Sequence, residues 1–209
     1  YSAALSGGGA QPSEVEVSAD YFADDDPYQA AEHPVLRNLP NIADPNALEA
    51  FEALSVLQRS EEPFPQGSLD AEHFKAVHRH LFQDVYDWAG QPRTIRIFKD
   101  GSPFCYPESF DQELRRIFSW LSKHDYLTGL SPQAFAKDAA WFLSELNAVH
   151  LFREGNGRAQ SAFLAMLAAE AGHPLDFDRL APEAWMAAMI VSFYNGTEPL
   201  AEQIASLIV

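Results

Sequence analysis

The sequence predicts an all-α domain that carries one small β-hairpin. After residue 44, apolar residues recur at helical spacing through most of the chain, and proline follows a capping residue at two of the helix starts. One segment near residue 95 alternates like a strand instead. With 209 residues, 47% of them hydrophobic, the chain is long enough to bury a substantial core in one domain.

The first two helices are predicted from their caps and their apolar spacing. Asp44-Pro45 has the pattern of an N-cap followed by proline at the first helical position. The apolar residues that follow it at helical spacing are Leu48, Phe51, Leu54 and Leu57. A second helix begins at Ser68 or Asp70 and places on one side Phe74, Val77, Leu81, Val85 and Trp88.

Four further helices are predicted in the C-terminal half. Ser131-Pro132 begins one that reaches Val149, and residues 158–171 are apolar nearly all round, which indicates a central buried helix. Gly172 ends that helix. Pro182 begins the next, and Thr197 can cap the last, which continues through Leu207.

The hairpin is predicted at about residues 93–106. Residues 94–98 alternate, Asp100-Gly101 is a typical hairpin turn, and residues 104–106 form the return arm. Because proline cannot donate a ladder hydrogen bond, Pro103 makes the return arm an edge or irregular strand.

Composition limits the function. The chain has 14 Lys and Arg against 30 Asp and Glu, a formal charge of −16, which argues against nucleic acid and anionic membrane surfaces as partners. No apolar run has the length of a membrane span. The single cysteine, Cys105, excludes an intramolecular disulfide. Residues 1–26 are acidic and lack a sustained period, so we expect a flexible lead-in before a domain of residues 27–209.

Residues 150–158, His-Leu-Phe-Arg-Glu-Gly-Asn-Gly-Arg, are the candidate active-site loop. A helix ends before them and another begins near Arg158, so the backbone N–H groups of Gly155, Asn156 and Gly157 lie at a helix N-terminus, which favours anions. Arg158 and Arg153 add positive charge to this candidate phosphate site.

Two side chains in the loop add chemistry to this anion site. Glu154 offers a hard oxygen of the kind that Mg²⁺ takes together with phosphate oxygens. His150 can exchange a proton near neutral pH. The alternative is a simple turn between two helices with solvated charges. The loop is neither a dinucleotide fingerprint nor a Walker loop.

The loop resembles the Fic motif, His-x-Phe-x-[Asp/Glu]-Gly-Asn-Gly-Arg-x-x-Arg, at every position through Arg158. Further similarity to the Fic family, over about residues 26–209, lies in the segments 26–28, 35–38, 44–45, 82–96, 194–196 and 199–200. The resemblance implies a Fic-type helical bundle, with the hairpin as a flap over the active site. It also implies a protein adenylyltransferase, which transfers AMP from ATP to a Ser, Thr or Tyr hydroxyl and releases pyrophosphate.

The resemblance also implies a role for each site residue. His150 deprotonates the target hydroxyl, Glu154 holds Mg²⁺, and residues 155–157 with Arg158 bind the phosphates. Phe152 points into the core. The flap pairs with an extended segment of the target protein, and its candidate docking residues are Ile95, Ile97, Lys99 and Phe104.

Ser161 is the departure from the family pattern, because it stands where the second arginine of the motif holds the γ-phosphate. ATP would then bind more weakly or in another pose, or another nucleotide would replace it. Two alternatives therefore stay open: a Fic enzyme that transfers a different nucleotide or phosphate-linked group, and a silenced Fic domain that only binds. The sequence contains no [Ser/Thr]-x-x-x-Glu-[Gly/Asn] inhibitory motif. A small antitoxin-like inhibitor protein remains a further open partner.

The resemblance does not identify the target or the biological setting. The protein is expected in the cytoplasm, or in a host cytosol if it is a delivered effector. The roles of bacterial toxin, effector and regulator are equally compatible with these residues. His73, His78 and His80 lie on one expected helix, and solvated or core-edge positions are favoured for them over a metal site.

Overall fold

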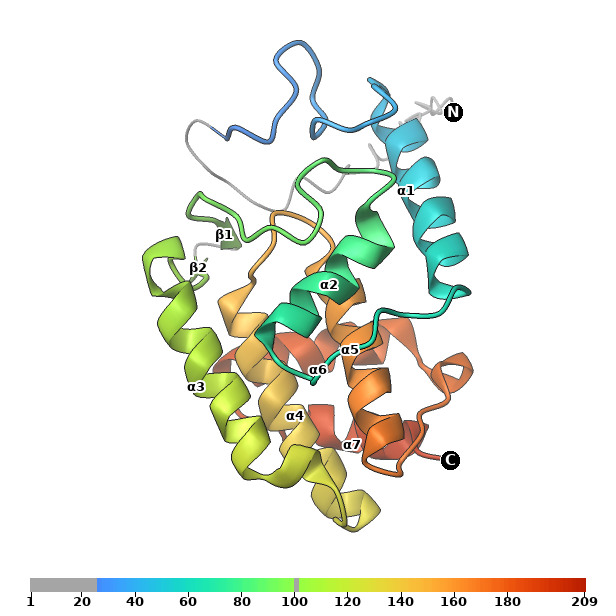
Figure 1. Ribbon diagram of the computed structural model, residues 1–209, viewed down its shortest axis with the longest axis vertical. Helices are drawn as coiled ribbons and strands as arrows, with labels where there is room; N and C mark the ends of the chain where they lie inside the picture. The colour runs from blue at the N-terminus through green and yellow to red at the C-terminus, as the bar shows by residue number, and fades with distance from the viewer. Residues whose placement is uncertain (1–25, 100–101) are drawn as a thin grey trace, which may run out of the picture.

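The computed structural model describes residues 26–99 and 102–209, and it shows a helical body with one small hairpin (Figure 1). This confirms the all-α prediction. The described helices are α1 (Pro45–Ser60), α2 (Ala71–Phe82), α3 (Phe110–Lys123), α4 (Pro132–Val149), α5 (Asn156–Glu170), α6 (Pro182–Tyr194) and α7 (Glu198–Leu207). The expected lead-in lies outside the described residues except for Asp26.

Side-chain caps explain where three helices begin. Asp44 accepts a hydrogen bond from Ala47 N at 2.8 Å in front of α1, and Ser131 accepts one from Ala134 N at 3.3 Å in front of α4. Of the two predicted starts for α2, Asp70 is the capping residue, since its carboxylate accepts from the backbone N–H three residues later.

The structure differs from the predicted helices in three places. α2 ends at Phe82, so Val85 and Trp88 are buried in the loop after it rather than on the helix. Leu54 and Leu57 of α1 face solvent, with 68% and 58% of their surface exposed. The helix α3 was not predicted, although its buried residues have helical spacing: Phe110, Leu114, Ile117, Phe118 and Leu121.

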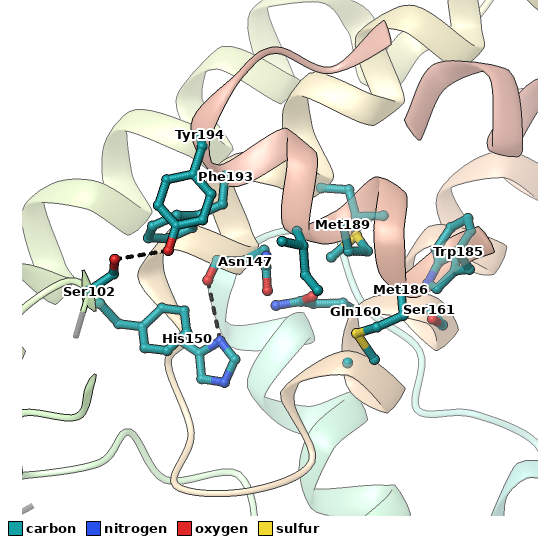
Figure 2. Close-up of a pocket in the computed structure, with 14 residues that line it drawn as sticks. Ser102, Asn147, His150, Gln160, Ser161, Trp185, Met186, Met189, Phe193 and Tyr194 are labelled. Atoms are coloured by element: carbon teal, nitrogen blue, oxygen red, sulfur yellow. Dashed lines mark hydrogen bonds between the residues drawn. The ribbon is translucent and has the colours of Figure 1, made fainter. Parts of the chain in front are cut away.

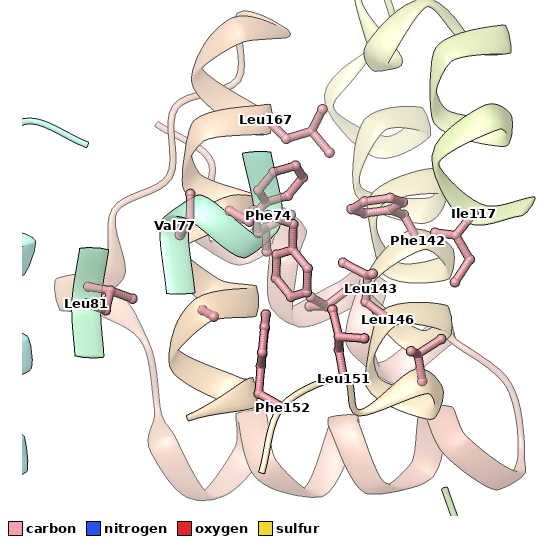
Figure 3. Packing of buried hydrophobic residues seen from close by; sticks show 14 of the residues in the cluster. Phe74, Val77, Leu81, Ile117, Phe142, Leu143, Leu146, Leu151, Phe152 and Leu167 are labelled. Atoms are coloured by element: carbon pink, nitrogen blue, oxygen red, sulfur yellow. The ribbon is translucent and has the colours of Figure 1, made fainter. Parts of the chain in front are cut away.

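The core surrounds α4, which packs against α3, α5, α6 and α7. On the other side α5 packs against α2, and α2 against α1. α5 thus shares with α4 the central position that was predicted for it. Figure 3 shows how side chains from four helices and the loop after α4 meet in the core: Phe74, Val77, Leu81, Ile117, Phe142, Leu143, Leu146, Leu151, Phe152 and Leu167. The α4–α5 loop is thus anchored to the core through Leu151 and Phe152.

The hairpin is shorter than predicted. Its strands are β1 (Phe98–Lys99) and β2 (Ser102–Pro103), which pair antiparallel with Phe98 opposite Pro103. The predicted turn, Asp100-Gly101, lies outside the described residues. Phe104 N still donates to Ile97 O at 3.2 Å beyond the strand ends, so the segment leads directly from the hairpin toward the α4–α5 loop.

Candidate active site

His150 is the residue that ends α4. It adopts the left-handed conformation, with φ at 47°, and its ring lies against the ring of Phe104 with the centroids 4.0 Å apart. Its Nδ1 lies 3.3 Å from Asn147 O (Figure 2). Because a carbonyl can only accept, Nδ1 carries the proton in the neutral ring, and Nε2 carries the lone pair. In this tautomer Nε2 is the ring atom that can accept a proton.

Arg93 connects the hairpin to the end of α4. Its buried guanidinium donates to His150 O at 2.8 Å, Cys105 O at 2.7 Å and Val149 O at 3.3 Å, and also to Ile95 O. Two of these carbonyls belong to the C-terminal end of α4, where the helix dipole favours a positive charge. One side chain thus holds both His150 and the hairpin in place.

The first turn of the loop is braced from within. Asn156 accepts a hydrogen bond from Phe152 N at 2.9 Å and donates to Phe152 O at 2.8 Å. The ring of Phe152 is fully buried, as predicted. The side chain of Asn156 therefore folds the loop back on itself, and its backbone N–H is a candidate phosphate donor.

A buried histidine supports the same loop from α2. His78 Nε2 lies 2.9 Å from Glu154 O, and its Nδ1 accepts from Gly90 N at 2.9 Å. Its ring stacks on Phe152 at 3.7 Å between centroids. Burial lowers the pKa of His78 to about 4, so the ring is neutral near pH 7 and donates through Nε2. Its position is more deeply buried than the expected core-edge one.

α5 begins directly at the loop. Gly155, at φ 78°, precedes its first turn, and a Cβ at this position would lie 2.3 Å from the ring of Phe82. Only glycine fits there. The N–H groups of Asn156, Gly157 and Arg158 have no partner within the helix and favour anions. Gly157 has open space where a Cβ would stand.

Glu154 lies beside this helix N-terminus. Its Oε1 accepts from Gly155 N at 2.8 Å and lies 3.5 Å from Arg158 Nη2. Burial, followed by the negative charge of Glu52, raises the pKa of Glu154. Within residues 26–99 and 102–209 no group of three His, Cys, Asp or Glu side chains can hold a metal. Glu154 is a single carboxylate whose other oxygen, Oε2, could bind a Mg²⁺ that arrives with phosphate oxygens. One carboxylate does not suffice for a metal held by protein ligands alone.

A pocket of about 190 Å³ opens beside His150 and is lined by α4, α5, α6 and the hairpin (Figure 2). Most of its wall is apolar: Phe104, Leu143, Trp185, Met186, Met189, Ile190 and Phe193. Ser161 lies in it, and the residues that line it include no Lys, Arg, Asp or Glu. Gln160 is 1% exposed, and neither polar atom of its amide has a hydrogen-bond partner. A buried amide without a partner is unfavourable, so this one favours a polar ligand in the pocket.

Three groups of predicted site residues are placed differently. The backbone N–H of Gly155, expected to bind phosphate, donates instead to Glu154 Oε1 at 2.8 Å. Arg153 is buried in an ion pair with Asp26 at 2.8 Å, so the structure gives it a structural partner where phosphate binding was expected. The side chain of Ile97 is fully buried and cannot dock a target, and Phe104 faces His150. Ile95 packs against the core and is half-buried. Lys99 lies in β1, and its side chain is outside the described part of the chain.

Comparison with known proteins agrees with this geometry. The Fic/DOC family model matches residues 68–168. The probable protein adenylyltransferase y4lH of Sinorhizobium fredii is 49% identical over 189 residues, which cover 87% of this chain and 98% of the relative. The chain belongs to the Fic/DOC family. The Fic-type resemblance of the sequence is thereby confirmed.

Further relatives of this Fic domain include a second named adenylyltransferase and an effector protein solved with a nucleotide. Protein adenylyltransferase VbhT of Bartonella schoenbuchensis is 37% identical over 85% of this chain, which covers 38% of that relative. The BepC protein of Bartonella tribocorum, solved with bound AMPPNP, has a TM-score of 0.78 at 29% identity, over 87% of this chain and 96% of the other. The curated relatives are thus named as nucleotidyltransferases, and a similar structure holds a bound nucleotide. No helix in the described ranges is long and apolar enough to cross a membrane.

Four residues of this Fic domain with a place in the site were missed from the sequence: Glu52, Arg93, Asn147 and Gln160. Glu52 is a buried acid in a helix where Leu54 and Leu57 face solvent, and Arg93 is a buried cation. Asn147 offered a weak signal, since it lies one helical turn before His150. The other three are recognised only once distant segments are brought together.

Proposed function

We propose that this protein transfers AMP from ATP to a Ser, Thr or Tyr hydroxyl of a target protein and releases pyrophosphate. The observation that carries the proposal is the placement of His150 beside both the α5 N-terminus and the uncharged pocket. Phosphates are bound at the helix N-terminus by the N–H groups of residues 156–158 and by Arg158. The adenine of ATP lies in the pocket. Its apolar walls and two amides, those of Asn147 and Gln160, suit a flat ring with polar edges.

The reaction then follows from the position of His150. The target hydroxyl oxygen attacks the α-phosphorus while His150 Nε2 takes its proton. The bond from the α-phosphorus to the oxygen that bridges to the β-phosphate breaks, and pyrophosphate leaves. Glu154 would hold the Mg²⁺, which neutralises phosphate charge when bound. The N–H groups at α5 and Arg158 stabilise the charge that develops on the phosphates.

The target segment is proposed to lie along the open edge of the hairpin, held by backbone hydrogen bonds. Because similar proteins include effectors that are translocated by Bartonella, the target belongs either to the producing cell or to a host cell. An inhibitor protein that acts through a glutamate could not form its ion pair here, because Ser161 stands where the family has an arginine.

The deciding experiment uses ATP labelled at either the α- or the γ-phosphate. The protein is incubated with Mg²⁺ and with bacterial and eukaryotic lysates side by side, and labelled proteins are identified by mass spectrometry. Relative to the same lysates without the protein, additional label from the α-phosphate alone, with the mass of one AMP on a hydroxyl residue, is expected. Additional γ-label that depends on the protein would indicate a kinase and would contradict the proposal.

Ser161 supports a second candidate, transfer of a different nucleotide. The pocket residues offer no cation at this position for a γ-phosphate. The same assay with CTP, GTP and UTP decides between the two candidates, and a clear preference for ATP excludes the second.

The Gln160→Leu variant tests whether the adenine of the nucleotide binds in this pocket. Removing the amide is expected to weaken binding of AMPPNP about tenfold, because one hydrogen bond to the base is lost. The same change should raise thermal stability, since a buried amide without a partner is removed. Calorimetric titration and thermal unfolding measure the two effects, with exposed Gln133→Leu on α4 as control. An unchanged affinity for AMPPNP would show that the adenine does not bind beside Gln160.

A further inference from the structure

Arg158, the arginine of the α5 N-terminus, is held by groups from three parts of the chain. Its Nη2 lies 2.5 Å from Glu52 Oε1 of α1 and 3.5 Å from Glu154 Oε1. Its guanidinium carbon lies 4.8 Å from the ring centre of Phe82 at the end of α2. The side chain of Arg158 is 38% exposed, whereas that of Glu52 is 10% exposed. The exposed cation therefore rests on a largely buried anion.

Glu52 is itself fixed on both of its oxygens. While Oε1 binds Arg158, Oε2 accepts a hydrogen bond from the hydroxyl of Tyr86. Tyr86 is 3% exposed, and its ring stacks on Trp88 with 4.3 Å between centroids. Burial and the charge of Glu52 raise the pKa of Tyr86, so the hydroxyl keeps its proton and donates. The carboxylate thus has one defined orientation.

Burial of a carboxylate at position 52 is unfavourable for folding. Removing a carboxylate from water is unfavourable until an ion pair and hydrogen bonds compensate for it. The neighbouring buried position on the same face of α1 is Leu48, which packs into the core. An apolar residue in place of Glu52 would pack there without that cost. The charge is therefore explained by Arg158 rather than by the packing of α1.

We propose that Glu52 is a positioning residue that fixes the guanidinium of Arg158 for the nucleotide phosphates. The inference rests on the proposed function, since Arg158 is taken there as a phosphate ligand. Both carboxylate contacts fall on Nη2, which leaves the Nε and Nη1 donors for phosphate oxygens. A flexible arginine held in one orientation needs no reorganisation when charge develops on the phosphates.

Glu52 also brings a negative charge close to the phosphates. Its removal should therefore act differently on binding and on reaction. Binding loses the orientation of Arg158 but gains from the lost repulsion, so the affinity for AMPPNP should stay within about threefold. We expect the lost orientation of Arg158 to dominate the effect on the rate, so kcat should fall roughly tenfold.

A double-mutant cycle tests the inference, because Glu52 is argued to act only through Arg158. Glu52→Gln, Arg158→Ala and the double variant are compared with Glu49→Gln, an exposed control on the same helix. In the wild-type background Glu52→Gln should lower kcat about tenfold, and in the Arg158→Ala background it should have no further effect. Equal losses in both backgrounds, or no loss in either, would overturn the inference.

Two further measurements keep the inference testable. If Glu52→Gln does not fold, Tyr86→Phe keeps the carboxylate but frees one oxygen, and should lower kcat about threefold only while Arg158 is present. NMR of ¹⁵N-arginine-labelled protein needs no turnover: a slowly rotating Arg158 guanidinium is expected in the wild type and a freely rotating one in the variant. If the wild type transfers no AMP, the proposed function fails, while this signal still decides whether Glu52 fixes Arg158. Free rotation in both proteins would contradict the role of Glu52.

Discussion

His150→Ala is expected to lower AMP transfer by roughly 10²–10⁴-fold, the usual contribution of a general base. No other proton acceptor is proposed for the target hydroxyl, and His150 ends α4 with its ring at the pocket. AMPPNP affinity should change little, because the proposed phosphate donors belong to α5. Initial rates of AMP transfer and calorimetric titration with AMPPNP measure the two quantities.

The backbone of His150 requires a second variant. Its φ of 47° is a conformation that asparagine tolerates well and alanine less so. His150→Asn should therefore keep the end of α4 intact and still lose the rate. Exposed His33→Ala serves as the control. A variant at position 150 that folds and retains wild-type rates would exclude His150 as the base.

Arg93→Met should have the largest effect on stability, a loss of about 3–5 kcal/mol. The change leaves four carbonyls without this donor, two at the end of α4 and two on the hairpin side. For a chain of this size such a loss lowers the melting temperature by roughly 10 °C. Thermal unfolding measures it.

The activity of Arg93→Met should also fall at temperatures where the variant is still folded. Arg93 holds both the backbone of His150 and the segment next to Phe104, so the rate is expected to fall even in folded protein. Arg93→Lys keeps the charge but not the fork of donors and should rescue only part of the stability. Exposed Arg115→Met is the matched control. A melting temperature of Arg93→Met equal to that of the control would show that these hydrogen bonds contribute little.

Local chemistry made much of this fold predictable. Capping residues and proline predicted the starts of α1, α4 and α6, since these signals act within one helical turn. The signal in α3 was a different one, the helical spacing of its buried residues, and it was overlooked. The hairpin was predicted too long, because strand pairing depends on its partner and not only on alternation.

The supporting residues of the site could not be predicted in this way. Glu52 meets Arg158 across 106 residues, and Arg93 meets His150 across 57. The periodicity of a helix indicates which side is apolar, but not which buried polar partner will arrive from another helix. Arg153 shows the same limit, since it has the charge of a phosphate ligand and is instead paired with Asp26.

That pair also determines where the chain can be shortened. The acidic composition alone would suggest a fragment that begins at residue 27. Such a fragment would remove the carboxylate that lies 2.8 Å from Arg153, in the middle of the active-site loop and 127 residues away in sequence. A fragment that begins a few residues earlier keeps both partners. For this protein the N-terminal boundary of an expression fragment therefore also decides whether the candidate active-site loop keeps its ion pair.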